Sequence, residues 1–476
     1  MTESTAVAST IPSTELVGAA RRRFLLPLAL AQFICSFAGS NMNVMINDIS
    51  EDLDTDVQGV QIAITLFLLI MAILMIPGSK LTDRWGRKRC FIGGLTLYGI
   101  GALLSAIAPG LGVLILGNSV FEGVGTALLI PPVYILATLA FSDVTSRARA
   151  FGVISGLGGI GAAAGPLIGG LIAWGISWRA AFIFQALVVA AIILLSRRMI
   201  DPLPPDPTRP FDVVGAILSA VGMFFIVLGI LQADTNGLLF ALFLAIGIAF
   251  LIGFYLYIRA RERAGREPLL STGLFKNRTS NLALATQNAQ WFILMGTSFV
   301  VAVYLQTVRG YNPIKTGVIF TAATLGVLVS SLAAERLAKK RTQKTLIMAG
   351  FVVALAGIVV LIGLVGAWSS VVAFVPGLLL IGLGLGVMLT PSVNVVQSSF
   401  PEEQQGEISG LSRSVSNLGS TFGTAIAGTI LVSGLTTGAY ALAMGSLGVV
   451  AILGLAAAML LPANPAPQAD RGESRP

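Results

Sequence analysis

The chain has 476 residues, of which 55 % are hydrophobic and 11 % are charged. A soluble globular protein carries about 25 % charged residues, so this composition excludes a soluble, disordered or collagen-like chain. The sequence contains no histidine and only two cysteines, Cys35 and Cys90, which excludes His-based catalysis, HExxH zinc sites and a disulfide framework. We therefore predict an all-α polytopic membrane protein with no metal, no cofactor and no enzyme activity.

Fourteen apolar runs are each long enough to cross the hydrocarbon core of a bilayer, which takes a helix of about 20 residues. They lie near residues 24–46, 58–79, 90–108, 111–139, 150–174, 179–196, 212–233, 238–258, 282–306, 315–334, 345–366, 370–399, 408–433 and 439–461. The first run follows three arginines and is too long for a cleaved signal peptide. We interpret it as an uncleaved first span.

The basic residues predict the orientation of these spans. With a cytoplasmic N-terminus, all of the 30 Lys and Arg residues except Arg179, Arg309 and Lys315 fall on the cytoplasmic side, Arg413 included. This asymmetry follows the positive-inside rule and predicts a cytoplasmic (inner) membrane protein with both termini in the cytoplasm. The net charge of +8 then needs no nucleic-acid partner, because membrane lipids provide the opposing surface.

An internal repeat divides the chain. The tetrapeptide Ile-Ser-Gly-Leu at 154–157 recurs at 408–411, in the fifth and thirteenth runs, and a basic loop follows both the second and the tenth. Two parallel six-helix repeats around a midplane site are typical of transporters. We predict a cytoplasmic N-tail (1–20), an N-terminal six-helix bundle (21–200), a linker with two inserted central helices (201–280), a C-terminal six-helix bundle (281–462) and a C-tail (463–476).

Several motifs resemble those of a known family. The loop Gly78–Arg89 reads Gly-Ser-Lys-Leu-Thr-Asp-Arg-Trp-Gly-Arg-Lys-Arg and resembles the GxLaDrxGRk motif of the major facilitator superfamily. The stretch Gly161–Gly170 resembles the GxxxGPxxGG motif of its drug–proton antiporters. Further stretches are similar to the fourteen-span branch, namely Phe211–Gly215, Pro268–Arg278, Tyr304–Tyr311 and Ser409–Gly419. The chain is thereby identified as a divergent member of that branch.

The resemblance implies a set of residues that control conformational change. In this family the loop motif locks the cytoplasmic side, and the glycine-proline motif forms a stiff interface between the halves that favours exchange over co-transport. The small residues also allow two helices to approach closely, and Pro166 removes a backbone donor, so a purely structural role remains open. The predicted gating residues are Gly78, Asp83, Arg84, Gly86, Arg87, Gly161, Gly165, Pro166, Gly169 and Gly170.

The chain departs from the family where intramembrane charges are expected. Ala38 stands where the family has an acid in span 1, and in span 4 Ser119 stands where it has an arginine. Glu122 is instead the one acid deep inside a span, roughly 17 Å from its start at 1.5 Å per residue. A charge at that depth costs at least ~2.5 kcal/mol, which predicts a proton-coupling site at Glu122.

The resemblance also implies that spans 1, 4, 9 and 12 line the central cavity, and other polar residues lie on these spans. Asn118 and Thr126 lie four residues on either side of Glu122, on one helical face. Each such residue also fits a role as interhelical glue. The predicted substrate-cavity residues are Gln32, Ser36, Ser40, Asn43, Asn118, Thr126, Gln287, Gln290, Trp291, Asn394 and Gln397.

These features predict a proton-driven exporter of amphipathic or cationic small molecules that works by alternating access, with the proton gradient as its energy source. Its expected partners are a small-molecule substrate, protons and lipids, and we expect a monomer. The second hypothesis is a proton symporter or a lipid or metabolite transporter on the same fold. The third, a membrane enzyme or receptor without transport, is disfavoured by the missing histidines and the lack of a soluble sensory domain.

Overall fold

A computed structural model describes residues 19–141, 144–197, 199, 201, 205–208, 210–233, 235–338, 340–368, 370–401 and 404–462. Within this part of the chain every regular element is helical, and fourteen helical spans are long and apolar enough to cross a membrane. Each span ends within five residues of its predicted boundary. The predicted all-α architecture with fourteen spans is therefore confirmed.

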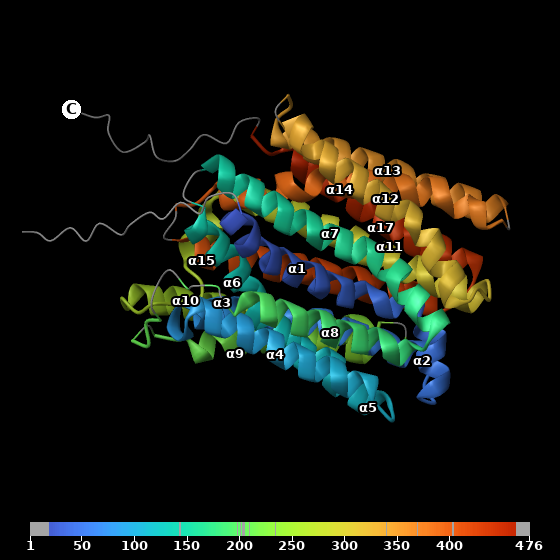
Figure 1. The fold of residues 1–476 in the computed structure, drawn as a ribbon, viewed down its shortest axis with the longest axis horizontal. Coiled ribbons are helices and arrows are strands. Elements are labelled where there is room, and N and C mark those ends of the chain that lie inside the picture. The colour runs from blue at the N-terminus through green and yellow to red at the C-terminus, as the bar shows by residue number, and fades with distance from the viewer. Residues whose placement is uncertain are drawn as a thin grey trace, which may run out of the picture.

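The helices lie roughly along one common direction (Figure 1). The N-terminal six spans contain α1 (Ala19–Asn41), α2 (Ile46–Asp52), α3 (Val57–Trp85), α4 (Arg87–Ala106), α5 (Leu111–Leu114), a π-helix (Ile115–Glu122), α6 (Gly123–Ala140), α7 (Val144–Gly175) and α8 (Trp178–Ser196). The last six contain α11 (Arg278–Val303), α12 (Pro313–Ala338), α13 (Gln343–Ala367), α14 (Val375–Gln397), α15 (Gln405–Phe422), α16 (Gly428–Val432) and α17 (Thr437–Met459). Short 3₁₀- and π-helices occupy Met42–Val44, Thr272–Lys276, Tyr304–Val308, Val371–Phe374 and Gly423–Ala427.

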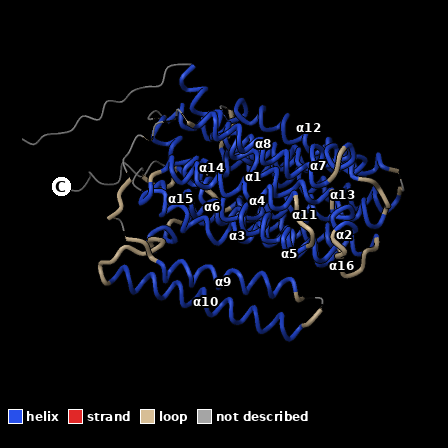
Figure 2. Tube along the Cα trace, turned by 60° about the horizontal axis from the view of Figure 1, so that its bottom comes forward, coloured by secondary structure: helices blue, strands red, loops and turns tan. Residues whose placement is uncertain are grey.

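The two inserted spans, α9 (Val213–Leu231) and α10 (Gly237–Arg263), form a hairpin at the side of the bundle (Figure 2). They pack on each other, and α9 packs on α3. Asp212 caps α9 by accepting a 3.0 Å bond from the Gly215 amide, and its other oxygen accepts one from the Leu269 amide at 3.0 Å. This buried carboxylate therefore ties the start of the hairpin to the segment that follows it.

Two helix pairs join the halves. Helix α7 packs against α12, and α15 packs against α3. In the sequence repeat α7 corresponds to α15 and α3 to α12, so the two contacts are the same interaction made twice by pseudosymmetric partners. At the first, a Cβ on Gly170 would lie 2.5 Å from the Pro313 carbonyl oxygen, and one on Gly317 would lie 2.6 Å from the Pro166 oxygen.

The rest of the glycine-proline motif packs inside the N-terminal half. A Cβ on Gly161 would overlap the Phe33 carbonyl oxygen of α1, one on Gly165 would overlap the Ser40 hydroxyl, and Gly169 lies against Asn41. The motif thus faces two ways: its first three glycines hold α7 against α1, and its end holds α7 against the other half. Its close packing role is the one predicted for small residues between membrane helices.

Replacing Gly161 by Ala is expected to destabilise the protein by about 1–3 kcal/mol, since the added methyl group meets backbone that cannot rotate away. Gly156→Ala on the same helix is the matched control, because a Cβ there meets nothing within 4 Å. Thermal unfolding of the purified variants should show a lower Tm for Gly161→Ala only. Equal Tm values would contradict the close contact between α7 and α1.

Candidate functional site

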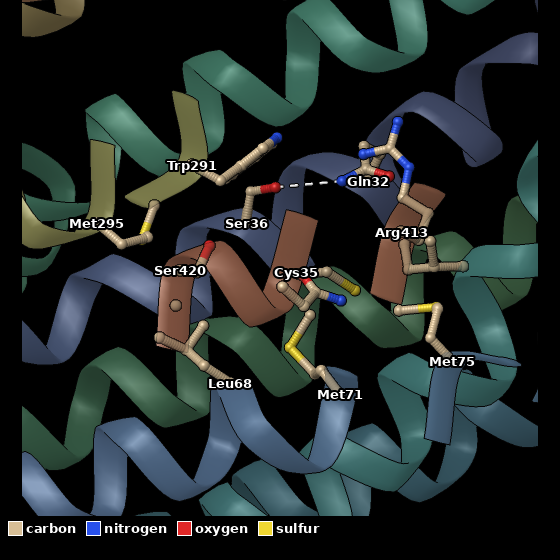
Figure 3. Close-up of a pocket in the computed structure, with 13 residues that line it drawn as sticks. Gln32, Cys35, Ser36, Leu68, Met71, Met75, Trp291, Met295, Arg413 and Ser420 are labelled. Carbon is tan, nitrogen blue, oxygen red and sulfur yellow. Dashed lines mark hydrogen bonds between the residues drawn. The ribbon is translucent and has the colours of Figure 1, made fainter. Parts of the chain in front are cut away.

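A small pocket of about 20 Å³ lies between the two halves. The helices α1, α3 and α6 supply one wall, and α11 and α15 supply the other (Figure 3). Sulfur-containing, aromatic and aliphatic side chains dominate, with a few polar groups among them. The lining residues are Gln32, Cys35, Ser36, Gly39, Leu68, Met71, Met75, Ile130, Trp291, Met295, Arg413, Asn417 and Ser420.

The polar groups of the pocket are connected at one end. The Gln32 amide donates to the Ser36 hydroxyl at 3.2 Å, and the Tyr134 hydroxyl donates to the Gln32 oxygen at 3.3 Å. The guanidinium carbon of Arg413 lies 4.2 Å from the centre of the Tyr134 ring. Figure 3 shows Gln32 and Arg413 at the same end of the pocket, so an amide and a cation stand together there.

Arg413 corrects the sequence analysis, which counted it among the cytoplasmic bases. It belongs to α15, is 5 % exposed, and lines the pocket. Its position five residues inside the predicted thirteenth run was the available indication. Sequence reasoning missed it because a long basic side chain that close to a span end usually reaches the interface.

Glu122 is fully buried at the end of the π-helix Ile115–Glu122, against α4. Neither carboxylate oxygen has a hydrogen-bond partner. A Cβ on Gly101 of α4 would lie 2.8 Å from the Glu122 amide nitrogen, so the absence of a side chain there lets the two helices meet. Such π-helical segments occur frequently at functional sites.

Glu122 does not line the pocket; Cys35 is the link between them. Cys35 lines the pocket and lies close enough to Glu122 for the carboxylate charge to act on it, as does Tyr98 of α4. The Tyr98 hydroxyl donates to the Gln185 side-chain oxygen of α8. The expectation of a cationic substrate depended on an acid in the cavity, whereas the charged lining residue is Arg413.

The predicted neighbours of Glu122 are also buried. Asn118 and Thr126 have side-chain polar atoms without hydrogen-bond partners, so the face that carries Glu122 has a run of unsatisfied groups. Ser119, which stands where the family has an arginine, donates to the Ala63 carbonyl oxygen of α3 at 2.8 Å. A buried polar atom without a partner is costly, so a proton, a water molecule or a ligand would stabilise these groups.

Of the eleven predicted cavity residues, Gln32, Ser36 and Trp291 line the pocket. The other eight lie elsewhere, and four of them, Asn43, Gln287, Gln290 and Gln397, are bonded to neighbouring helices. Asn43 donates to Ser298 at 2.9 Å, and Gln290 donates to the Leu385 oxygen at 3.4 Å. Gln287 accepts from Ser412 at 2.8 Å, and Gln397 accepts from Ser409 at 3.3 Å. Ser40 donates to a carbonyl oxygen of its own helix, and Asn394 is half-buried on α14.

Polar contacts lie beyond one end of the pocket, where α3 continues past the lining residues, and join α3 to α15 and to Glu267. Lys80 binds Glu407 of α15 at 2.6 Å and Glu267 at 2.9 Å. The neighbouring Ser79 hydroxyl donates to the Gly406 carbonyl oxygen at 2.7 Å. We call Lys80, Glu267 and Glu407 the Lys80 clamp.

Other bonds join the halves beyond the opposite end. Asn43 binds Ser298, and the Gln306 amide donates to the Asn43 carbonyl oxygen at 2.8 Å. Thr307 donates to the Asn47 side chain at 3.2 Å. We call Asn43, Ser298 and Gln306 the Asn43 clamp. Both clamps are formed in this structure, one beyond each end of the pocket.

The predicted gating loop lies next to the Lys80 clamp. A Cβ on Gly78 would overlap the Ala127 carbonyl oxygen of α6, and Gly86 adopts φ 93° between α3 and α4, a conformation that favours glycine. Arg87 is 7 % exposed, while Arg84 borders a second hollow with Trp85 and Pro205. The side chain of Asp83 lies outside the described residues.

The sequence profile of the Major Facilitator Superfamily matches residues 28–424, and again 286–476. The chain belongs to the Major Facilitator Superfamily. Membership makes it a multi-pass membrane transporter rather than an enzyme, and the predicted assignment to the fourteen-span branch is confirmed.

Relatives and a solved structure agree with this assignment. The chain is 30 % identical to the puromycin resistance protein pur8 of Streptomyces alboniger, over 85 % of this chain and 81 % of that one. It is 28 % identical to the multidrug efflux pump LfrA of Mycolicibacterium smegmatis, over 78 % and 73 %. A peptide transporter (POT) crystallised with sulfate superposes with a TM-score of 0.65 and 17 % identity, covering 92 % and 94 %, which shows the common fold.

Proposed function

We propose that this transporter exports amphipathic small molecules in exchange for protons. The observation that carries the proposal is a mostly apolar pocket between pseudosymmetric halves, with a fully buried carboxylate in the same bundle. The relatives pur8 and LfrA, named for puromycin resistance and multidrug efflux, support export of such compounds.

The two clamps supply the alternation. Rocking of the halves about the α7–α12 and α15–α3 contacts would break the Lys80 clamp while the Asn43 clamp stays closed, or the reverse. A substrate then meets the pocket from one side at a time, as alternating access requires. A state with both clamps formed would be the intermediate between the two states in which one clamp is broken.

Glu122 is the proposed proton carrier. A proton bound from one side removes the charge of the carboxylate inside the membrane, and its release to the other side restores it. Since the Glu122 charge reaches Cys35, which lines the pocket, the protonation state of the carboxylate alters the potential that a bound substrate meets. The proton gradient would thus drive export without a cofactor.

We also propose an inner-membrane location with both termini in the cytoplasm, and a monomer as the working unit. The distribution of Lys and Arg supports the orientation, since the Lys80 clamp and the basic Arg84–Arg89 stretch share one end of the bundle. A single chain contains both halves and the complete pocket, so the proposed cycle needs no second copy.

A substrate panel in a bacterial host that lacks its own efflux pumps tests this function. Expression of the chain should lower the intracellular level of amphipathic dyes and drugs, and a protonophore should abolish the difference. A Ser36→Phe variant, which fills the pocket, is the control for expression. Accumulation of panel compounds above the empty host would instead establish uptake, and the symporter hypothesis would replace export.

A further inference from the structure

We infer that the pocket binds amphipathic molecules that carry a negatively charged group, with Arg413 as the residue that recognises this group. The inference rests on the proposed function only in taking the pocket as the substrate site. It names the charge of the substrate, which the proposed export of amphipathic molecules does not specify. Its evidence is the charge and the hydrogen-bonding state of Arg413.

Arg413 is a cation without a compensating anion. Among the described residues no carboxylate pairs with it, and its Nη2 atom is buried and has no hydrogen-bond partner. Its described contact is the Tyr134 ring, which attracts the charge but accepts no bond from the outer nitrogen in the guanidinium plane. A buried guanidinium in this condition is stabilised most by an anion that accepts two bonds side by side.

The surroundings of Arg413 favour an anion over a cation. No residue that lines the pocket is acidic, and Glu122 is not among the lining residues. The Gln32 amide, beside Arg413 in Figure 3, is a second donor at the same end. A bound cation would face Arg413 with no countercharge, whereas a carboxylate or sulfonate would face two donors.

The other end of the pocket sets the rest of the ligand. Met71 and Met295 are flexible, polarisable side chains that adapt to different apolar shapes, and Trp291 offers a flat ring for stacking. The cavity measures about 20 Å³ in this state, room for a single water molecule, so a larger ligand enters only when the halves move apart. The fitting ligand is therefore an aromatic or aliphatic body with one anionic group at the Arg413 end.

Three probes of nearly equal shape test the inference by equilibrium binding to the full chain in nanodiscs: dansylglycine (an anion), dansylglycinamide (neutral) and N-(2-aminoethyl)dansylamide (a cation). We expect dansylglycine to bind most tightly. The loss of one charge-assisted contact in Arg413→Gln should weaken dansylglycine about 10- to 100-fold and the amide far less. Arg413→Lys, which keeps the charge but loses the fork, should give an intermediate affinity.

Several results would overturn the inference. These are tighter binding of the cation than of the anion by the unchanged protein, equal weakening of all three probes by Arg413→Gln, or binding of none. The probe order of the unchanged protein remains decisive if Arg413→Gln fails to fold. Binding needs no gradient, so failure of proton-driven transport with the expected probe order would contradict the proposed function and leave this inference standing.

Discussion

Glu122→Gln should abolish uphill transport driven by a pH gradient while exchange of substrate across the membrane without a gradient continues. The amide has nearly the same shape and cannot bind and release a proton, so the variant resembles the protonated state permanently. Because Glu122 lies outside the pocket wall, substrate contacts are preserved. Proteoliposomes with an imposed gradient measure the first activity, and counterflow of labelled substrate measures the second.

Two further variants make this result specific. Glu122→Asp retains a carboxyl group and should restore part of the uphill transport. Glu51→Gln removes an exposed acid on α2 and should leave it intact. Uphill transport by Glu122→Gln at the level of the unchanged protein would exclude Glu122 as the coupling group.

Breaking the Lys80 clamp should open the pocket on that side, and the native Cys35 can report it. Neither Cys35 nor Cys90 forms a disulfide, so a Cys90→Ser background leaves one reporter thiol in the pocket wall. Lys80→Gln removes two charge-assisted bonds, so a larger fraction of the molecules should have the pocket open on that side. We therefore expect a maleimide to label Cys35 about tenfold faster in this variant.

Arg179→Gln is the matched control for this prediction. Arg179 of α8 binds Asp52 of α2 at 2.6 Å, but both residues belong to the N-terminal half. Its loss should leave the Cys35 labelling rate unchanged. Equal labelling rates in the Lys80 and Arg179 variants would show that the Lys80 clamp does not hold the halves together.

The sequence predicted the fold well because a membrane imposes simple rules. Span length, basic loops and the recurring Ile-Ser-Gly-Leu each reflect a constraint that acts on the chain locally. The glycines of α7 were predictable in the same way, because the close packing around Gly161 and Gly165 leaves no room for a larger side chain. The depth of Glu122 followed from counting residues along a helix.

The composition of the pocket was less predictable because it depends on how each helix is rotated. In a span that is apolar on all sides, hydrophobic periodicity does not say which face meets the other half. Asn43 and Gln287 turned out to bind neighbouring helices, whereas Asn417 and Ser420 line the pocket. Arg413 was missed for the same reason: its direction is set by packing of α15 on α3 and α11.

The π-helix before α6 adds a further uncertainty that no sequence pattern revealed. A π-helix has more residues per turn than an α-helix, so counting in steps of four does not fix the direction of Glu122 relative to α1 and α4. The structure places Glu122 against α4 and outside the pocket wall. This position separates the proposed proton carrier from the proposed substrate contacts.

The lumen pH of proteoliposomes, followed with a trapped pH-sensitive dye, tests the exchange of substrate for protons most directly. With the Lys80 side facing outward and an acidic lumen, substrate added outside should raise the lumen pH, because protons leave as substrate enters. Glu122→Gln should give no pH change. Acidification of the lumen on substrate addition, or an equal rise with Glu122→Gln, would contradict proton antiport through Glu122.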